Sequence, residues 1–191
     1  KSLFDTGHGN KAFLVFIVCL AVMVGAIITA SLIQTDFGRV AVTNVTYKNF
    51  NGIPIRAKLL VPEKASPDNL VPGVVYIHGY QNNRETGDAY CIELAKRGFT
   101  VLNIDAIGRG NSGLPNNPED PDFDKSYGGL TSLNHLRALP FVNPASVGMM
   151  GHSLGAEMAY AVALADPAVK ALVITGFAYT LHATLTRPKN M

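Results

Sequence analysis

A run of 22 uncharged residues, Ala12 to Ile33, constrains this 191-residue chain more than any other feature. Hydrocarbon offers no partner to backbone N–H and C=O groups, so such a run can enter a bilayer only as a helix. At 1.5 Å per residue that helix is roughly 33 Å long, enough to cross the hydrocarbon core. We therefore predict one transmembrane helix over residues 12–33, with the lipid bilayer as its partner.

A cleaved signal peptide is the alternative interpretation, and it would make the protein secreted. Its apolar stretch should cover about 7–15 residues and end at an Ala-x-Ala-like site. The run here is longer, and its nearest small-residue site, residues 29–31, fits that pattern poorly. Lys1 and Lys11 precede the run while Arg39 and Lys48 follow it, so the flanking charges favour neither orientation.

Composition and chain ends limit what the remaining residues can be. Sixteen basic and fourteen acidic residues are spread along the sequence without a basic run, which argues against nucleic acid as a partner. The chain starts without methionine and stops without a closing element, so we expect a fragment. We assign residues 1–11 to an N-terminal flank, 34–39 to a linker, and 40–191 to the N-terminal part of one truncated domain.

Short β-rich runs alternate with helical stretches beyond residue 39. Asn51-Gly52 predicts a hairpin between strands 40–47 and 53–61. Residues 73–77 form a continuous apolar run, as expected for a strand buried on both faces of a parallel sheet, and three further buried strands are predicted at 99–104, 146–150 and 171–175. Helices are expected at 88–97, 127–139 and 154–165. This order predicts an α/β fold, an open and mostly parallel sheet with helices on both faces, whose ligands bind beyond the carboxyl ends of the strands.

The sequence Gly151-His152-Ser153-Leu154-Gly155 matches the G-x-S-x-G pattern of a serine nucleophile. It follows a predicted buried strand and opens a predicted helix, which is the strand-turn-helix setting that this chemistry requires. The tight turn exposes the serine Oγ, and the helix beginning at Leu154 directs unpaired N–H groups toward an anion. Ser153 is therefore the candidate nucleophile.

Two further segments complete a resemblance to the α/β-hydrolase superfamily. His78-Gly79 follows strand 73–77, and Asp105 begins a D-x-x-G-x-G-x-S segment after strand 99–104. Together with the serine turn they resemble the dienelactone hydrolase and acyl esterase/peptidase branches, over residues 40 to about 180. The resemblance implies that the backbone N–H groups of Tyr80 and Leu154 bind the oxyanion. It gives supporting roles to His78, Gly79, Gly151, His152, Gly155 and Asp105, the last bracing its loop with the nearby arginine.

The triad of this superfamily cannot be completed from these residues. The acid and the histidine base follow the serine in the chain. Asp166 is the last acidic residue, and His182 is the only histidine after Ser153 and comes too early for the base. His152 adjoins the nucleophile and cannot easily turn to face its Oγ. We expect truncation to account for the missing residues and the fragment to be inactive.

Other candidate sites are weaker. Acidic residues 119, 120, 122 and 124 lack the spacing of a calcium loop and are interpreted as a solvated loop. Cys91 is expected in the core. Phe123 and Tyr127 could line an acyl pocket with Tyr80 or simply pack. No metal-ligand cluster, phosphate loop or dinucleotide motif occurs, so we expect no cofactor and no metal.

The sequence thus predicts a membrane-anchored serine hydrolase that cleaves an ester, thioester, lactone or amide through an acyl-enzyme on Ser153. Its partner would be a small-molecule acyl substrate. A non-catalytic α/β-hydrolase-like module for binding or scaffolding is the alternative, because one fold can serve both roles. Substrate and oligomeric state cannot be read from these residues.

Overall fold

The computed structural model describes residues 6–120 and 122–177, and the chain divides into two compact units, residues 1–39 and 40–191. The first unit contains a single long helix, α1 (Thr6–Gln34). Within residues 9–34 of this helix, an 18-residue stretch has a mean hydropathy of 2.9 and is not buried by other described residues. Large apolar side chains such as Phe13, Val22 and Ile27 are each more than 60% exposed. The helix is therefore long and apolar enough to cross a membrane.

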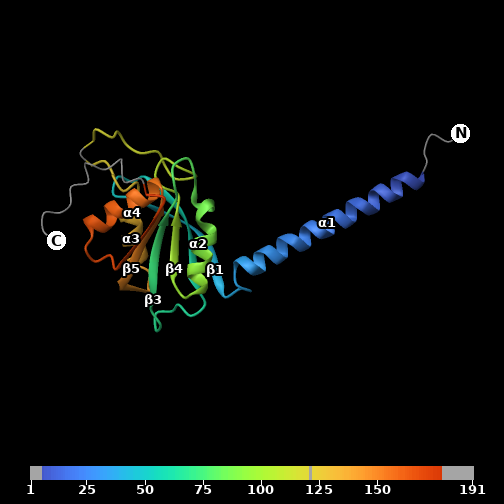
Figure 1. Ribbon diagram of the computed structural model, residues 1–191, viewed down its shortest axis with the longest axis horizontal. Coiled ribbons are helices and arrows are strands. Elements are labelled where there is room, and N and C mark those ends of the chain that lie inside the picture. The colour runs from blue at the N-terminus through green and yellow to red at the C-terminus, as the bar shows by residue number, and fades with distance from the viewer. Residues whose placement is uncertain (1–5, 121, 178–191) are drawn as a thin grey trace. The chain divides into compact units, whose positions relative to one another are not determined.

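The second unit is built on a six-stranded sheet of order β1-β2-β4-β3-β5-β6 (Figure 1). β2 runs antiparallel to both of its neighbours, and β4, β3, β5 and β6 run parallel to one another. The carboxyl ends of these four strands therefore meet at one edge. The strands are β1 (Val40–Lys48), β2 (Pro54–Pro62), β3 (Val71–Ile77), β4 (Thr100–Ile104), β5 (Val142–His152) and β6 (Ala171–Thr175).

Helices cover both faces of this sheet, as the sequence predicts (Figure 1). Alternate residues of a strand point to opposite faces, and the core accordingly forms two clusters. The larger cluster packs α3 (Gly129–Arg137) and α4 (Leu154–Ala165) against residues such as Val75 and Ile104. The smaller packs α2 (Asp88–Lys96), including Cys91, against Tyr76 and Val101 on the other face. A short 3₁₀ helix, η1 (Arg84–Gly87), precedes α2.

The hairpin and most element boundaries agree with the sequence predictions, but the helix predicted from residue 127 begins two residues later. Tyr127 and Gly128 have φ angles of +49° and +95°, which are incompatible with a right-handed helix. The strand predicted over 146–150 extends instead from Val142 to His152, and its pairing with β3 shifts register between Val71 and Gly73.

The last strand departs from its prediction in burial. The apolar run 171–175 was expected to be buried on both faces, yet Val173 and Ile174 are 48% and 39% exposed. Within the described part of the chain β6 pairs with β5 alone and so forms an edge of the sheet. An apolar run predicts a strand well, but it does not reveal how much of the protein covers that strand.

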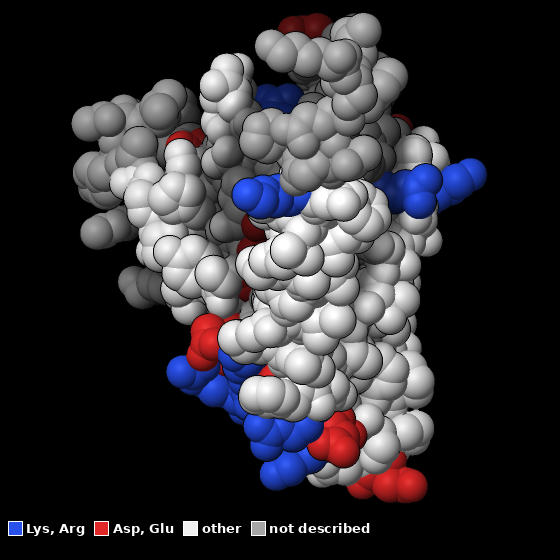
Figure 2. All heavy atoms as spheres, turned by 90° about the vertical axis from the view of Figure 1, so that its right-hand side faces the viewer, with Lys and Arg blue, Asp and Glu red and all other residues white. Residues whose placement is uncertain are grey.

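The acidic loop between β4 and α3 also differs from its prediction, because Asp124 is buried rather than solvated. Its carboxylate accepts hydrogen bonds from the amides of Ser126 and Gly128, at 3.0 and 2.9 Å, and from the Asn49 side chain. These bonds fix the approach to α3 and join it to the β1–β2 hairpin. In the lower part of the face shown in Figure 2, basic and acidic side chains lie next to one another.

Candidate functional site

The turn between β5 and α4 holds Ser153 in an unusual backbone conformation. Its φ and ψ are +52° and −120°, in a region that a residue with a side chain rarely adopts. The Ser153 amide donates to the Thr175 carbonyl at 2.8 Å, which ties this turn to the end of β6. The residue is half-buried, and among the described residues its Oγ has no hydrogen-bond partner. The strand therefore turns abruptly into the helix at the serine.

Two glycines make the abrupt turn possible. A Cβ placed on Gly151 would lie 2.1 Å from the Gly155 carbonyl oxygen. A Cβ on Gly155 would lie 2.2 Å from the carbonyl oxygen of Ile77. Real Cβ atoms are not found at such distances, so α4 can begin this close to β5 and β3 only if both positions lack a side chain.

The loop after β3 lies directly against the serine turn. A Cβ on Gly79 would meet the Ser153 Cβ and the His152 ring, both at 3.3 Å. Tyr80, the next residue, has an amide that donates to no acceptor within the described residues. Leu154 opens α4, and the first amides of a helix have no intrahelical acceptor. The structure thus brings Gly79 against Ser153 and leaves amides on both sides of this contact without backbone partners.

His78 joins the ends of two neighbouring strands. The side chain is buried, its Nδ1–H donates to the Gly79 carbonyl at 2.8 Å, and its Nε2 accepts from the Ala106 amide at 3.2 Å. This pattern requires the neutral imidazole with the proton on Nδ1, because Nε2 must have a lone pair to accept a bond. Burial lowers the pKa of His78, which also favours the neutral ring. His78 therefore holds the loop at Gly79 in place and does not face Ser153.

Asp105 braces the loops on the far side of β3. It is 1% exposed and accepts bonds from the Arg84 amide at 2.8 Å, the Arg84 Nη1 at 3.0 Å and the Asn111 amide at 3.0 Å. The arginine that pairs with Asp105 is thus Arg84 of η1, and not an arginine of the segment that Asp105 begins. The sequence did not predict the role of Arg84, because no local pattern around an arginine in a polar loop indicates an ion pair with a distant carboxylate.

The aromatic residues considered for a pocket fall into two groups. Tyr80 is 59% exposed, and the Arg109 guanidinium lies over its ring, 4.9 Å from the centroid. Phe123 and Tyr127 contact one another edge to face at 5.4 Å, and Tyr127 also packs against the larger core cluster. Tyr80 thus borders the serine turn, whereas Tyr127 has a packing role.

The possible partners of an activated serine do not reach Ser153 within the described residues. The His152 ring is exposed, and its Nδ1 lies 3.0 Å from the Thr175 Oγ1. Asp166 follows the carboxyl end of α4 and forms an ion pair with Arg137, which lowers its pKa. His182 lies outside the described residues. The described residues also contain no group of three or more His, Cys, Asp or Glu side chains that could hold a metal ion.

A clear hollow lies elsewhere, between β1, β2, η1 and the loop after β4. Its volume is about 400 Å³, and Ser153 is not among its lining residues.

Comparison with known proteins places the fold in a family. The family model described as serine aminopeptidase, S33, matches residues 70–191, more than half of the chain. The chain belongs to this family. The resemblance to α/β-hydrolases is therefore confirmed, and with it the relation to its esterase and peptidase branch.

Curated relatives of this S33 chain include two bacterial proteins without a characterised activity. An uncharacterized Pseudomonas aeruginosa protein, PA2218, is 29% identical over 76% of this chain and 39% of its own length. The Escherichia coli protein YcjY is 27% identical over 67% of this chain and 43% of its own length. A serine hydrolase-like protein of Dictyostelium discoideum is 31% identical over 61% of this chain and 30% of its own length. The chain thus spans between about a third and two fifths of the relatives it matches.

Solved structures agree on the fold. The crystal structure of the Pseudomonas aeruginosa protein has a TM-score of 0.63 at 28% identity, covering 73% of this chain and 44% of that one. The acetyl xylan esterase 1 of Thermoanaerobacterium has a TM-score of 0.56 at 21% identity, covering 70% and 47% of the two chains. At the lower identity the likeness concerns the fold alone.

Proposed function

We propose that this chain is the nucleophile-bearing part of a membrane-anchored serine hydrolase that cleaves an ester, thioester, lactone or amide of a small molecule. Ser153 Oγ attacks the substrate carbonyl carbon while its proton passes to a histidine base. The carbonyl oxygen becomes an oxyanion, which the Tyr80 and Leu154 amides bind. Collapse of this intermediate expels the alcohol, thiol or amine, and water then releases the acyl group from Ser153.

The conformation of Ser153 carries this proposal. Backbone strain of this kind costs of order 1–3 kcal/mol and persists only where surrounding structure enforces it. Here the enforcing contacts are the backbone approaches at Gly151 and Gly155. A sharp turn from a parallel strand into a helix is the setting in which α/β-hydrolases expose a nucleophilic serine.

The two amides without acceptors support an oxyanion site beside Ser153. Amide donors that are fixed before reaction stabilise the charge that develops on the carbonyl oxygen, and losing one typically costs about 2.7–4 kcal/mol of transition-state stabilisation. The Tyr80 amide belongs to the loop that contacts Ser153 through Gly79, and the Leu154 amide begins α4. Both belong to backbone, so the site needs no particular side chain at these positions. His78 and Asp105 have supporting roles, since they hold the loops that carry it.

The acid and the base of the triad are proposed to lie after the described residues. Asp166 follows the far end of the 12-residue helix α4, and a helix of that length is about 18 Å long, which excludes direct contact with the serine turn. The His152 ring is engaged with Thr175. We therefore propose that residues 40–191 form only part of the catalytic domain and that residues 1–191 alone have no useful activity.

The membrane part of the proposal rests on α1. We propose that residues 12–33 are retained as a transmembrane anchor, with residues 1–11 and 34–39 as its flank and linker. A cleaved signal sequence, which would release the domain, remains the alternative.

Labelling with a fluorophosphonate probe tests the proposed nucleophile. The protein expressed from its complete gene should be labelled, Ser153→Ala should remove the label, and Ser66→Ala, in a surface loop, should retain it. Residues 1–191 alone should stay unlabelled, because no base activates the serine. An unlabelled complete protein would favour the non-catalytic module instead. Label that persists in Ser153→Ala would show that Ser153 is not the nucleophile.

A further inference from the structure

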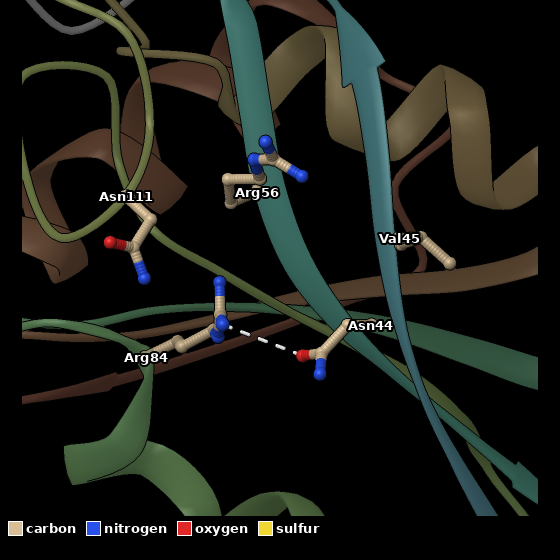
Figure 3. A pocket seen from close by; sticks show the side chains of 5 residues that line it. All are labelled: Asn44, Val45, Arg56, Arg84 and Asn111. Carbon is tan, nitrogen blue, oxygen red and sulfur yellow. Dashed lines mark hydrogen bonds between the residues drawn. The ribbon is translucent and has the colours of Figure 1, made fainter.

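The hollow on the β1 side of the sheet is lined by two arginines and two asparagines. Its lining residues are Asn44, Val45, Arg56, Arg84 and Asn111, and its volume is about 400 Å³. In Figure 3 the Asn111 carboxamide and the Arg84 guanidinium point toward one another, Arg56 extends from β2, and Asn44 and Val45 lie on β1. No carboxylate belongs to this set. The lining therefore offers positive charge and amide donors to a ligand.

The two guanidinium groups differ in how far the protein already uses them. Arg84 is largely buried, binds Asp105 through Nη1 and reaches the Asn44 Oδ1 through Nη2 at 3.4 Å. Its Nε is buried without a hydrogen bond among the described residues, and a Glu85 carboxylate oxygen lies 3.6 Å from it. A buried N–H without an acceptor is costly, so this guanidinium has hydrogen-bonding capacity that the described residues leave unused.

Arg56 adds a charge that is not neutralised locally. Its Nη1 donates to the Thr46 Oγ1 at 2.5 Å, and it forms no ion pair with any carboxylate in the described part of the chain. The two carboxylates that contact Arg84 are already engaged, Asp105 by Arg84 and Glu85 by Lys58. A ligand in the hollow would therefore meet the Arg56 charge without displacing an existing ion pair.

We propose that this hollow binds a phosphate group, held between Arg56 and Arg84 with the Asn111 and Asn44 carboxamides as further donors. A phosphate has several acceptor oxygens on different sides, which suits donors that come from two strands, a 3₁₀ helix and a loop. The phosphate can belong to a soluble phosphorylated compound or to the headgroup of an anionic lipid.

This binding site is separate from the proposed nucleophile. Arg56 lies on β2 and Ser153 follows β5, with β4 and β3 between these strands. At about 4.8 Å per strand spacing, the two positions are roughly 14 Å apart across the sheet. Phosphate binding is therefore expected to be independent of Ser153.

A ³¹P NMR titration of the whole chain, held in uncharged detergent micelles, tests the proposal with inorganic phosphate as the probe. Binding should be saturable and weaken with added salt. Arg56→Gln should weaken it by at least about tenfold, the loss expected for one charge-assisted bond. Asn111→Asp should abolish it by placing a negative charge in the hollow. The matched control is Arg97→Gln, which removes an exposed arginine at the end of α2 that forms an ion pair with Glu93. It should leave binding unchanged.

A second titration, with a short-chain water-soluble phosphatidic acid, distinguishes the two sources. Tighter binding than inorganic phosphate would support a lipid headgroup, and equal binding would support a soluble phosphate compound. Circular dichroism of each variant should match wild type. Absence of saturable binding to either probe would overturn the proposal, as would equal binding by folded Arg56→Gln and wild-type protein.

Discussion

Ser153 and its neighbouring glycines together allow the sharp turn between β5 and α4. Ser153 keeps a side chain where glycine would be easier, at φ +52°, and Gly151 and Gly155 give up side chains so that backbone can approach backbone. The motif is readable in the sequence because these constraints apply to adjacent residues. The absence of a side chain at Gly79, by contrast, matters only because the loop after β3 folds against Ser153. In the sequence, only the family resemblance suggests this contact.

Gly155→Ala should destabilise the domain strongly. The added methyl group would lie 2.2 Å from the Ile77 carbonyl oxygen, and neither backbone can withdraw without separating α4 from β3. We expect a loss of about 3 kcal/mol or more in the free energy of unfolding, at the upper end of overpacking effects. Urea unfolding followed by circular dichroism measures it. Gly25→Ala, whose methyl group meets nothing within 4 Å, is the control, and equal stability of the two variants would refute the packing argument.

At the scale of elements, a buried ion pair connects η1 to the end of β4. Arg84 lies in a short 3₁₀ helix that sequence patterns did not predict, and it binds Asp105 with both its amide and its guanidinium. The other differences between the predicted and the observed elements also depend on contacts between distant segments. Strands and helices with strong apolar periodicity were predicted close to their observed bounds, whereas the start of α3 depends on the positive φ of Tyr127, and the exposure of β6 depends on what packs beside it.

Arg84→Ala should cost stability through the carboxylate that it leaves behind. Asp105 is 1% exposed, and a buried charge deprived of its partner typically costs about 3–5 kcal/mol. The two backbone amides that also bind Asp105 should keep the loss near the lower value. Urea unfolding provides the measurement. Arg97→Ala, which breaks an exposed ion pair with Glu93, should change stability little, and a similar loss in both variants would show that Arg84 is not a structural brace.

At the scale of the whole molecule, one polypeptide combines an apolar helix with a hydrolase-type sheet. Both parts could be predicted from the sequence, because a run of 22 uncharged residues and the alternation of strands and helices are visible in local composition. The hollow between β1, β2, η1 and the loop after β4 could not be predicted in this way, because its lining residues come from four separate segments. Sites assembled across a sheet carry no contiguous pattern, so only the fold brings them together.

The membrane anchor can be tested with charges placed inside α1. The whole chain should remain in the membrane fraction after alkaline carbonate extraction. Val18→Lys combined with Val22→Lys should release it, since each central lysine costs about 2.5–3.5 kcal/mol on insertion. Gln34→Lys adds charge at the helix end and should have no effect. Extraction of the unaltered chain, or a mature protein whose N-terminal sequence begins after residue 33, would contradict a retained anchor.

The most direct test of the central claim is to trap the acyl group on Ser153. The protein expressed from its complete gene is incubated with p-nitrophenyl acetate, quenched in acid and analysed by mass spectrometry of its peptides. The account predicts one acetyl group on the peptide that carries Ser153, and none in Ser153→Ala. An acetyl group bound elsewhere, or ester hydrolysis that continues undiminished in Ser153→Ala, would contradict it.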